Sequence, residues 1–149
     1  MGDLVQSFSE KCEKLEHALL NIPKEEQAVC PLEHFFAPGI YMRKITMPKG
    51  VTGMGHKHTG KHYNIIMRGK VNVMIGEELI QVVKQGDIFI SQEGDQKVLH
   101  MVEETEWMTV HHNPDDETDI ETLEKRYTTH SDTFKEHQKM LEEETCHTG

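Results

Sequence analysis

The chain has 149 residues, 36% of them hydrophobic, and a formal net charge of −10 at pH 7. This length suits one domain with its own core, and no run approaches the roughly 18 apolar residues of a membrane-spanning helix. Nucleic-acid binding draws on clustered basic side chains, which this acidic chain lacks. We therefore expect no membrane and no nucleic-acid partner.

The three cysteines, Cys12, Cys30 and Cys146, are an odd and widely spaced set. Such a set is typical of free thiols in a reducing compartment and not of a disulfide framework. The first residues show neither the basic nor the apolar region of a secretory signal. We expect a cytoplasmic protein.

The first predicted element is a helix that ends before Pro23. Its apolar residues recur at multiples of three and four, which is helical spacing. They are Leu4, Phe8, Leu15, Leu19 and Ile22. We assign residues 1–29 to an N-terminal helical flank that packs on the domain or contacts a second subunit.

The middle of the chain has the pattern of a β domain. Short runs rich in Val, Ile, Tyr, Phe and Met are separated by Gly and Pro turns. The predicted strands are Ile40–Met47, His56–Arg68, Val71–Ile75, Leu79–Val83, Asp87–Ser91, Lys97–Val102 and Trp107–His111. Short strands at close, regular spacing indicate a mainly β sandwich or jelly-roll barrel, which we assign to residues 30–113.

Helical periodicity returns after the strands. Thr118 and Glu121 have the spacing of a capping box, and Ile120, Leu123 and Tyr127 share one helical face. A second helix is predicted over 133–144. Residues 113–149 hold eleven acidic and four basic side chains, a net charge of −7. We assign residues 114–149 to an acidic C-terminal helical tail, either solvated or an acidic docking segment.

The most informative stretch holds three histidines, His56, His58 and His62. On a straight strand they have the same parity, so their side chains point to one face. Neutral imidazole is the commonest protein ligand for a borderline transition metal, and no Cys-x-x-Cys pair suggests a zinc finger. The alternative is a set of exposed or hydrogen-bonded histidines in a chain that has 11 of them.

The same stretch resembles the first motif of the cupin superfamily, G-x5-H-x-H-x3-E-x6-G. Gly50, His56, His58 and Gly69 fall in register, and His62 stands where that motif has glutamate. The second motif, G-x5-P-x-G-x2-H, is met in part. Gly86 and Gly94 fit, whereas Gln92 replaces the proline and Lys97 the ligand histidine.

The resemblance implies a double-stranded β-helix barrel with flanking helices. It also implies a divalent transition metal (iron, manganese, nickel or zinc), a small-molecule ligand or substrate, and a homodimer. A narrower resemblance is to small cupin-like proteins of tailed phages and prophages. It covers His34–Arg43, His56-Lys57, His62–Ile65, Gly94 with Lys97, Trp107–His111 and Glu117–Glu124. Lysine at the position of Lys97 is usual in that group.

The sequence leaves three possibilities for a fourth metal ligand, which are His100, His111 or neither of them. His100 lies three residues beyond the motif position and points away from the face of Lys97 unless a bulge intervenes. His111 shares a face with Trp107 and Thr109. We take His56, His58, His62 and His100 as the candidate metal ligands.

Other side chains are candidates for contact with the ligand. We take Lys97 and Tyr63 as the catalytic candidates. Tyr41 and Arg43 are further residues that would bind a carboxylate or carbonyl.

Two functions follow from these residues and the resemblance. The first is a metal-dependent enzyme of the oxygenase type on a small organic acid, diketone or phenol, with isomerase, lyase or hydrolase chemistry as runners-up. The second is a non-catalytic phage-type cupin that serves as a binding, structural or assembly module. A catalytic site keeps an open coordination position and a pocket, whereas a structural site is closed.

Overall fold

The structure, a computed structural model, describes residues 14, 18, 30–55, 57–74, 80–94 and 97–129. The chain divides into a unit of residues 28–129 and a second unit of residues 1–27 with 130–149. Residues 114–129, which the sequence assigns to the tail, thus belong to the same unit as the strands. The helices predicted over 4–22 and 133–144 lie outside the described residues, apart from Lys14 and Ala18, which are helical.

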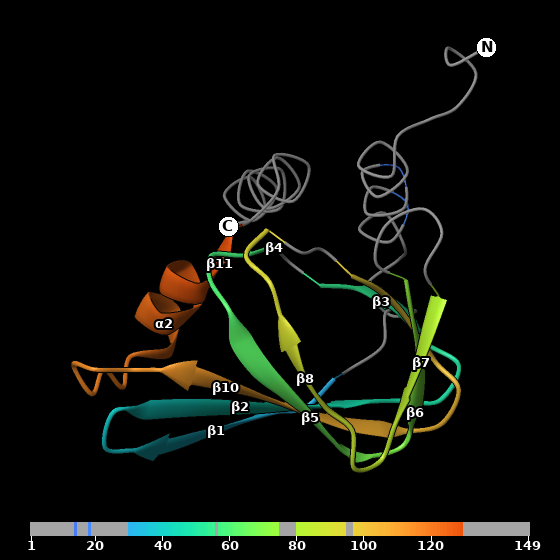
Figure 1. The fold of residues 1–149 in the computed structure, drawn as a ribbon, viewed down its shortest axis with the longest axis horizontal. Coiled ribbons are helices and arrows are strands. Elements are labelled where there is room, and N and C mark those ends of the chain that lie inside the picture. The colour runs from blue at the N-terminus through green and yellow to red at the C-terminus, as the bar shows by residue number, and fades with distance from the viewer. Residues whose placement is uncertain are drawn as a thin grey trace, which may run out of the picture. The chain divides into compact units, whose positions relative to one another are not determined.

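Two antiparallel sheets form the first unit (Figure 1). One has the order β1-β2-β10-β5-β8 and the other β3-β9-β6-β7, and β4 pairs separately with β11. The strands are β1 Leu32–Ala37, β2 Ile40–Met47, β3 Thr52–Met54, β4 Lys57–His58, β5 His62–Arg68, β6 Lys70–Met74, β7 Ile80–Lys84, β8 Ile88–Ser91, β9 Val98–Met101, β10 Thr105–His112 and β11 Thr128–Thr129. The predicted mainly β barrel is confirmed.

The core lies between the two sheets and draws side chains from both. Alternate residues of each strand face it, as the two-residue period of a strand requires. The buried cluster contains Met47, Ile66, Val71, Val73, Val83, Met101 and Trp107. This core fixes the inward face of each strand, and so determines which polar side chains also point inward.

Differences from the predicted strands are local. The prediction of one strand over His56–Arg68 was wrong, because the chain leaves the ladder after His58 and re-enters at His62. The backbone N–H of Thr59 donates to Tyr127 O (3.1 Å), and its hydroxyl donates to Arg126 O (2.7 Å). The segment thus changes partner from β11 to β10 and β8. The edge strand β1 is mostly exposed and lacks the alternation that would have revealed it.

The helix α2 (Ile120–Tyr127) confirms the predicted element but begins with a different cap. The side chain of Asp119, not Thr118, accepts the hydrogen bond from Thr122 N. Leu123 is fully buried, and the guanidinium of Arg126 binds Asp115 through two bonds of 2.7 and 2.8 Å. These contacts hold α2 and β11 against the end of the barrel where β4 lies. None of the described helices is long and apolar enough to cross a bilayer.

The outer face of the five-stranded sheet carries an apolar row that crosses all five strands. In register, Phe35 lies opposite Met42, Met42 opposite Val110, Val110 opposite Tyr63, and Tyr63 opposite Ile90. Phe35, Tyr63 and Ile90 are 41%, 52% and 47% exposed. A contiguous exposed apolar patch of this kind is typical of a protein interface, and it supports the expected homodimer.

The homodimer stays a prediction with a direct test. If two copies pair through this row, Ile90→Glu places a charge in the interface and gives a monomer in sedimentation equilibrium. Ile80→Glu is the matched control, because Ile80 is exposed on β7 of the other sheet. A wild-type monomer, or an Ile90→Glu protein that remains dimeric, would show that the row is not the interface.

Candidate functional site

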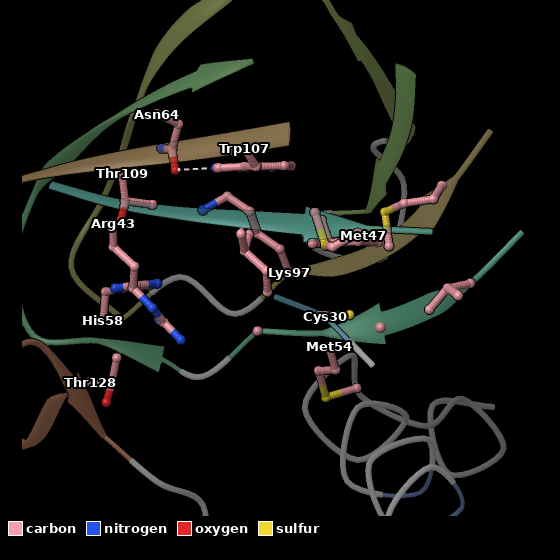
Figure 2. Close-up of a pocket in the computed structure, with 16 residues that line it drawn as sticks. Cys30, Arg43, Met47, Met54, His58, Asn64, Lys97, Trp107, Thr109 and Thr128 are labelled. Atoms are coloured by element: carbon pink, nitrogen blue, oxygen red, sulfur yellow. Dashed lines mark hydrogen bonds between the residues drawn. The ribbon is translucent and has the colours of Figure 1, made fainter. Parts of the chain in front are cut away.

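A cavity of about 340 Å³ opens into the interior of the barrel. This volume lies in the lower part of the range for small-molecule sites. The lining residues are Cys30, Arg43, Ile45, Met47, Val51, Gly53, Met54, Gly55, His58, Asn64, Lys97, Leu99, Met101, Trp107, Thr109 and Thr128. Most of the wall is apolar, and the polar side chains gather toward His58 (Figure 2). Burial raises the pKa of the Cys30 thiol, so this half-buried free cysteine is poorly nucleophilic.

A chain of hydrogen bonds holds the polar part of the wall. The Trp107 indole N–H donates to Asn64 Oδ1 (2.9 Å), and Asn64 Nδ2 donates to Ser91 Oγ (2.8 Å). Lys97 Nζ donates to the same hydroxyl. All four side chains are buried, so each bond satisfies a group that water does not reach. The network keeps the Lys97 ammonium inside the barrel.

Three histidines from three strands meet next to this cavity, and one of them, His58, lines it. His58 ends β4, His62 begins β5, and His111 lies near the end of β10. The ring centroids are 4.1 Å apart for His58 and His62, 4.9 Å for His62 and His111, and 6.3 Å for His58 and His111. Nδ1 of His58 is buried without a hydrogen-bond partner within the described residues. We call His58, His62 and His111 the histidine cluster.

Two tyrosine rings pack against His111 of the histidine cluster. The Tyr127 ring, at the end of α2, stacks on His111 at 4.7 Å, and Tyr41 of β2 stacks on it at 5.8 Å. The Tyr127 hydroxyl donates to His112 O, and the Tyr41 hydroxyl shares a 2.7 Å hydrogen bond with His34 Nδ1. The ring of His111 is therefore held in place from two elements, and α2 shields the cluster.

Two members of the cluster, His58 and His111, are neutral at physiological pH. Burial lowers the pKa of His58 to about 3, and His62, Lys97, His111 and Arg43 add to the shift. Burial also lowers the pKa of His111 to about 3, with further contributions from His62 and Arg43. A neutral imidazole has the lone pair that a metal ion needs.

These shifts predict that acid destabilises the protein. Both histidines have folded pKa values of about 3, below the ordinary 6.5. Between these values the unfolded chain binds more protons than the folded chain, so the free energy of unfolding falls as the pH drops through this window. Urea denaturation of chelator-treated protein at about pH 7 and about pH 5 measures the loss. His111→Gln should lose less stability than wild type over the same interval, and an equal loss would contradict the prediction.

The structure brings some of the predicted site residues together and not others. Lys97 and His58 line the cavity, His62 lies in the cluster, and His56 falls outside the described residues. His100 is exposed on β9, where its Nδ1 shares a 3.1 Å hydrogen bond with Thr52 Oγ1. It points away from the face of Lys97 because successive residues of a strand alternate.

Tyr63 is also separated from the cavity. It is 52% exposed on the outer face of β5, whereas its neighbours His62 and Asn64 point inward. The structure thus leaves Lys97 as the catalytic candidate inside the barrel.

Sequence reasoning did not identify Asn64, Ser91, Trp107 and Tyr127 as site residues. The parity of Asn64 with His62 on β5 was the available indication. The roles of Ser91 and Tyr127 depend on contacts with residues far along the chain, and such contacts leave no pattern in the sequence.

The side chains of the histidine cluster are suitable metal ligands, but their rings are not oriented as in a metal-bound site. Three imidazoles, two of them neutral and one with a buried unpartnered nitrogen, are suitable ligands for a divalent transition metal. The His62 and His111 rings stack at 29°, and no three His, Cys, Asp or Glu side chains in the described ranges stand in metal-binding geometry. Metal binding would require the rings to turn toward a common centre.

Comparisons with known proteins identify the fold. No family model matches the sequence, and no curated protein matches it. Among solved structures, the dimethylsulfoniopropionate lyase DddQ of Ruegeria pomeroyi gives a TM-score of 0.52 at 14% identity, over 66% of this chain and 54% of that one. A putative ethanolamine utilization protein Q of Salmonella typhimurium gives 0.50 at 11%, over 60% and 74%.

An RmlC-like cupin with a double-stranded β-helix fold, from Methanocaldococcus jannaschii, gives a TM-score of 0.49 at 15% identity, over 62% of this chain and 89% of that one. At such identities the likeness concerns the fold alone. The barrel has the cupin fold, as the motif resemblance implied.

Proposed function

We propose that this cupin-fold barrel binds a divalent transition metal through its histidine cluster and acts as a metal-dependent enzyme on a small organic molecule. The observation that carries the proposal is the convergence of three imidazoles from β4, β5 and β10 beside a cavity that His58 lines. His56, two residues before His58, is the fourth candidate ligand in this proposal.

The residues of the chain supply what such an enzyme needs. A metal held only by neutral imidazoles keeps its full charge and is a strong Lewis acid toward an oxygen ligand. Lys97, held by its hydrogen bond to Ser91, would supply an ammonium to such an oxygen ligand. The apolar wall keeps bulk water away from the bound molecule. Oxygenase chemistry on an organic acid, diketone or phenol is the leading candidate, followed by isomerase, lyase or hydrolase chemistry.

The metal content of untagged protein, purified without chelator and measured by elemental mass spectrometry, tests the proposal. We expect near-stoichiometric iron, manganese, nickel or zinc in wild type. His62→Ala and His111→Ala should each lose most of it, because each removes one imidazole of the proposed set. His100→Ala is the matched control and should retain the metal, since His100 lies outside the cluster. Equal content in all four folded proteins would exclude the cluster as the metal site.

One observation favours the second candidate, a non-catalytic module. The histidine rings stack with one another and with Tyr41 and Tyr127, so the cluster also has the form of a packed aromatic core. A folded protein that neither contains metal nor takes up added Zn²⁺ or Mn²⁺ would support this role.

A further inference from the structure

We propose that the cavity takes a monocarboxylate whose remaining part is apolar, with Arg43 as the residue that binds the carboxylate. This inference deepens the proposed function and rests on it, because the same cavity would hold the metal and the ligand. It names the chemical class of the ligand from the charge and the shape of the wall.

The charge of the wall is the first argument. Within the described residues, the lining holds the cationic side chains of Arg43 and Lys97 and no carboxylate, although the whole chain has a net charge of −10. The five ion pairs of the described part do not include Arg43, and its Nε is buried without a hydrogen-bond partner there. The guanidinium is thus partly buried with an unsatisfied donor and no counter-ion in the described part, and an anionic ligand supplies both the charge and the acceptor.

The position of Arg43 is the second argument. It lies on the inward face of β2, in register with Thr109 of β10, and Figure 2 shows its guanidinium beside His58. A carboxylate bound there lies close to the histidine cluster and to the Lys97 ammonium. A guanidinium binds a carboxylate through two parallel hydrogen bonds, so it favours this group over a neutral carbonyl.

The remainder of the cavity determines the other part of the ligand. Away from Arg43 and Lys97 the wall consists mainly of aliphatic and thioether side chains together with the Trp107 ring, with no further charged side chain among the described residues. A polar or doubly charged ligand would lose its hydration in this part without compensation. An aliphatic or alicyclic body of moderate size gains from the same wall.

The single tryptophan of the chain lines the cavity, so its fluorescence reports occupancy at the site itself. Cyclohexanecarboxylate is the probe, cyclohexanecarboxamide its neutral counterpart, and acetate the carboxylate without an apolar body. We expect cyclohexanecarboxylate to bind the wild-type protein about 10- to 100-fold more tightly than the carboxamide, which is the usual worth of hydrogen bonds to a charged group. It should also bind more tightly than acetate, because the ring buries apolar surface against the wall. Equal affinity of acid and amide would overturn the inference without any variant.

Variants test the role of Arg43. Arg43→Gln should weaken cyclohexanecarboxylate binding about 10- to 100-fold. Lys44→Gln, which removes a charge from the opposite face of β2, should leave it unchanged. Unchanged binding by Arg43→Gln, or no binding to wild type, would overturn the inference.

Each protein is assayed after chelator treatment and after loading with Zn²⁺, with its metal content recorded. Arg43-dependent binding in a protein that holds no metal supports the carboxylate site and contradicts the metal proposal. Stoichiometric metal together with ligand binding that does not depend on Arg43 supports the metal proposal and contradicts the carboxylate site.

Discussion

Gly69→Ala should destabilise the protein by about 2–5 kcal/mol. Gly69 ends the first cupin motif and joins β5 of one sheet to β6 of the other. Its φ of 100° lies in the left-handed region, and a Cβ there would meet the carbonyl oxygen of Glu104 and lie 2.7 Å from Thr105 Cα. These neighbours are backbone atoms at the start of β10, so the backbone there must move to relieve the contact. The midpoint of urea unfolding measures the loss.

Gly86→Ala is the matched control for this effect. Gly86 also has a left-handed φ, 92°, but no atom lies within 4 Å of the added Cβ. The free energy of unfolding of this variant should fall by only about 1–2 kcal/mol, which is the cost of holding alanine in the left-handed region. Equal losses in the two variants would mean that the close contact with Thr105 contributes nothing.

Asn64→Leu should lower the free energy of unfolding by about 2–4 kcal/mol, although leucine has a similar volume to asparagine. The change removes the acceptor of the Trp107 indole N–H and one donor to Ser91 Oγ. Trp107 is only 5% exposed, so its N–H has no access to water as a replacement partner. Each unsatisfied buried group costs about 1–3 kcal/mol. Urea unfolding of wild type and variant measures the difference.

Asn72→Leu controls for the change of residue type. Asn72 lies on β6 opposite Val82 and the exposed His100, on the outer face of its sheet. This substitution should change the free energy of unfolding by no more than about 0.5 kcal/mol. If Asn64→Leu were equally mild, the hydrogen-bond network would not be an element of stability.

The glycines of the two motifs show that the spacing of residues in the sequence predicted local backbone conformation. Gly50, Gly69, Gly86 and Gly94 all have positive φ values, between 82° and 100°, so the register of both cupin motifs corresponds to real backbone turns. Strand alternation likewise separated Lys97, which is buried, from His100, which is exposed. Both results are local, because they depend on the backbone at the residue itself.

Strand pairing was beyond the reach of such patterns. Parity placed His111 on the face of Trp107 and Thr109, but not beside His62. Only the pairing of β10 between β2 and β5 brings His111 to the cluster. The break after His58 has the same origin, because it is the pairing of β4 with β11 that draws the chain out of the ladder.

The sequence by itself determined the β class, most strand positions, the cupin resemblance and the set of candidate histidines. The tertiary structure decided which of the described histidines meet, which polar side chains enclose Lys97, and that Arg43 lines a cavity without a carboxylate among the described residues. The physical reason is that the face of a strand follows from its own two-residue period, whereas its neighbours follow from burial of the whole core.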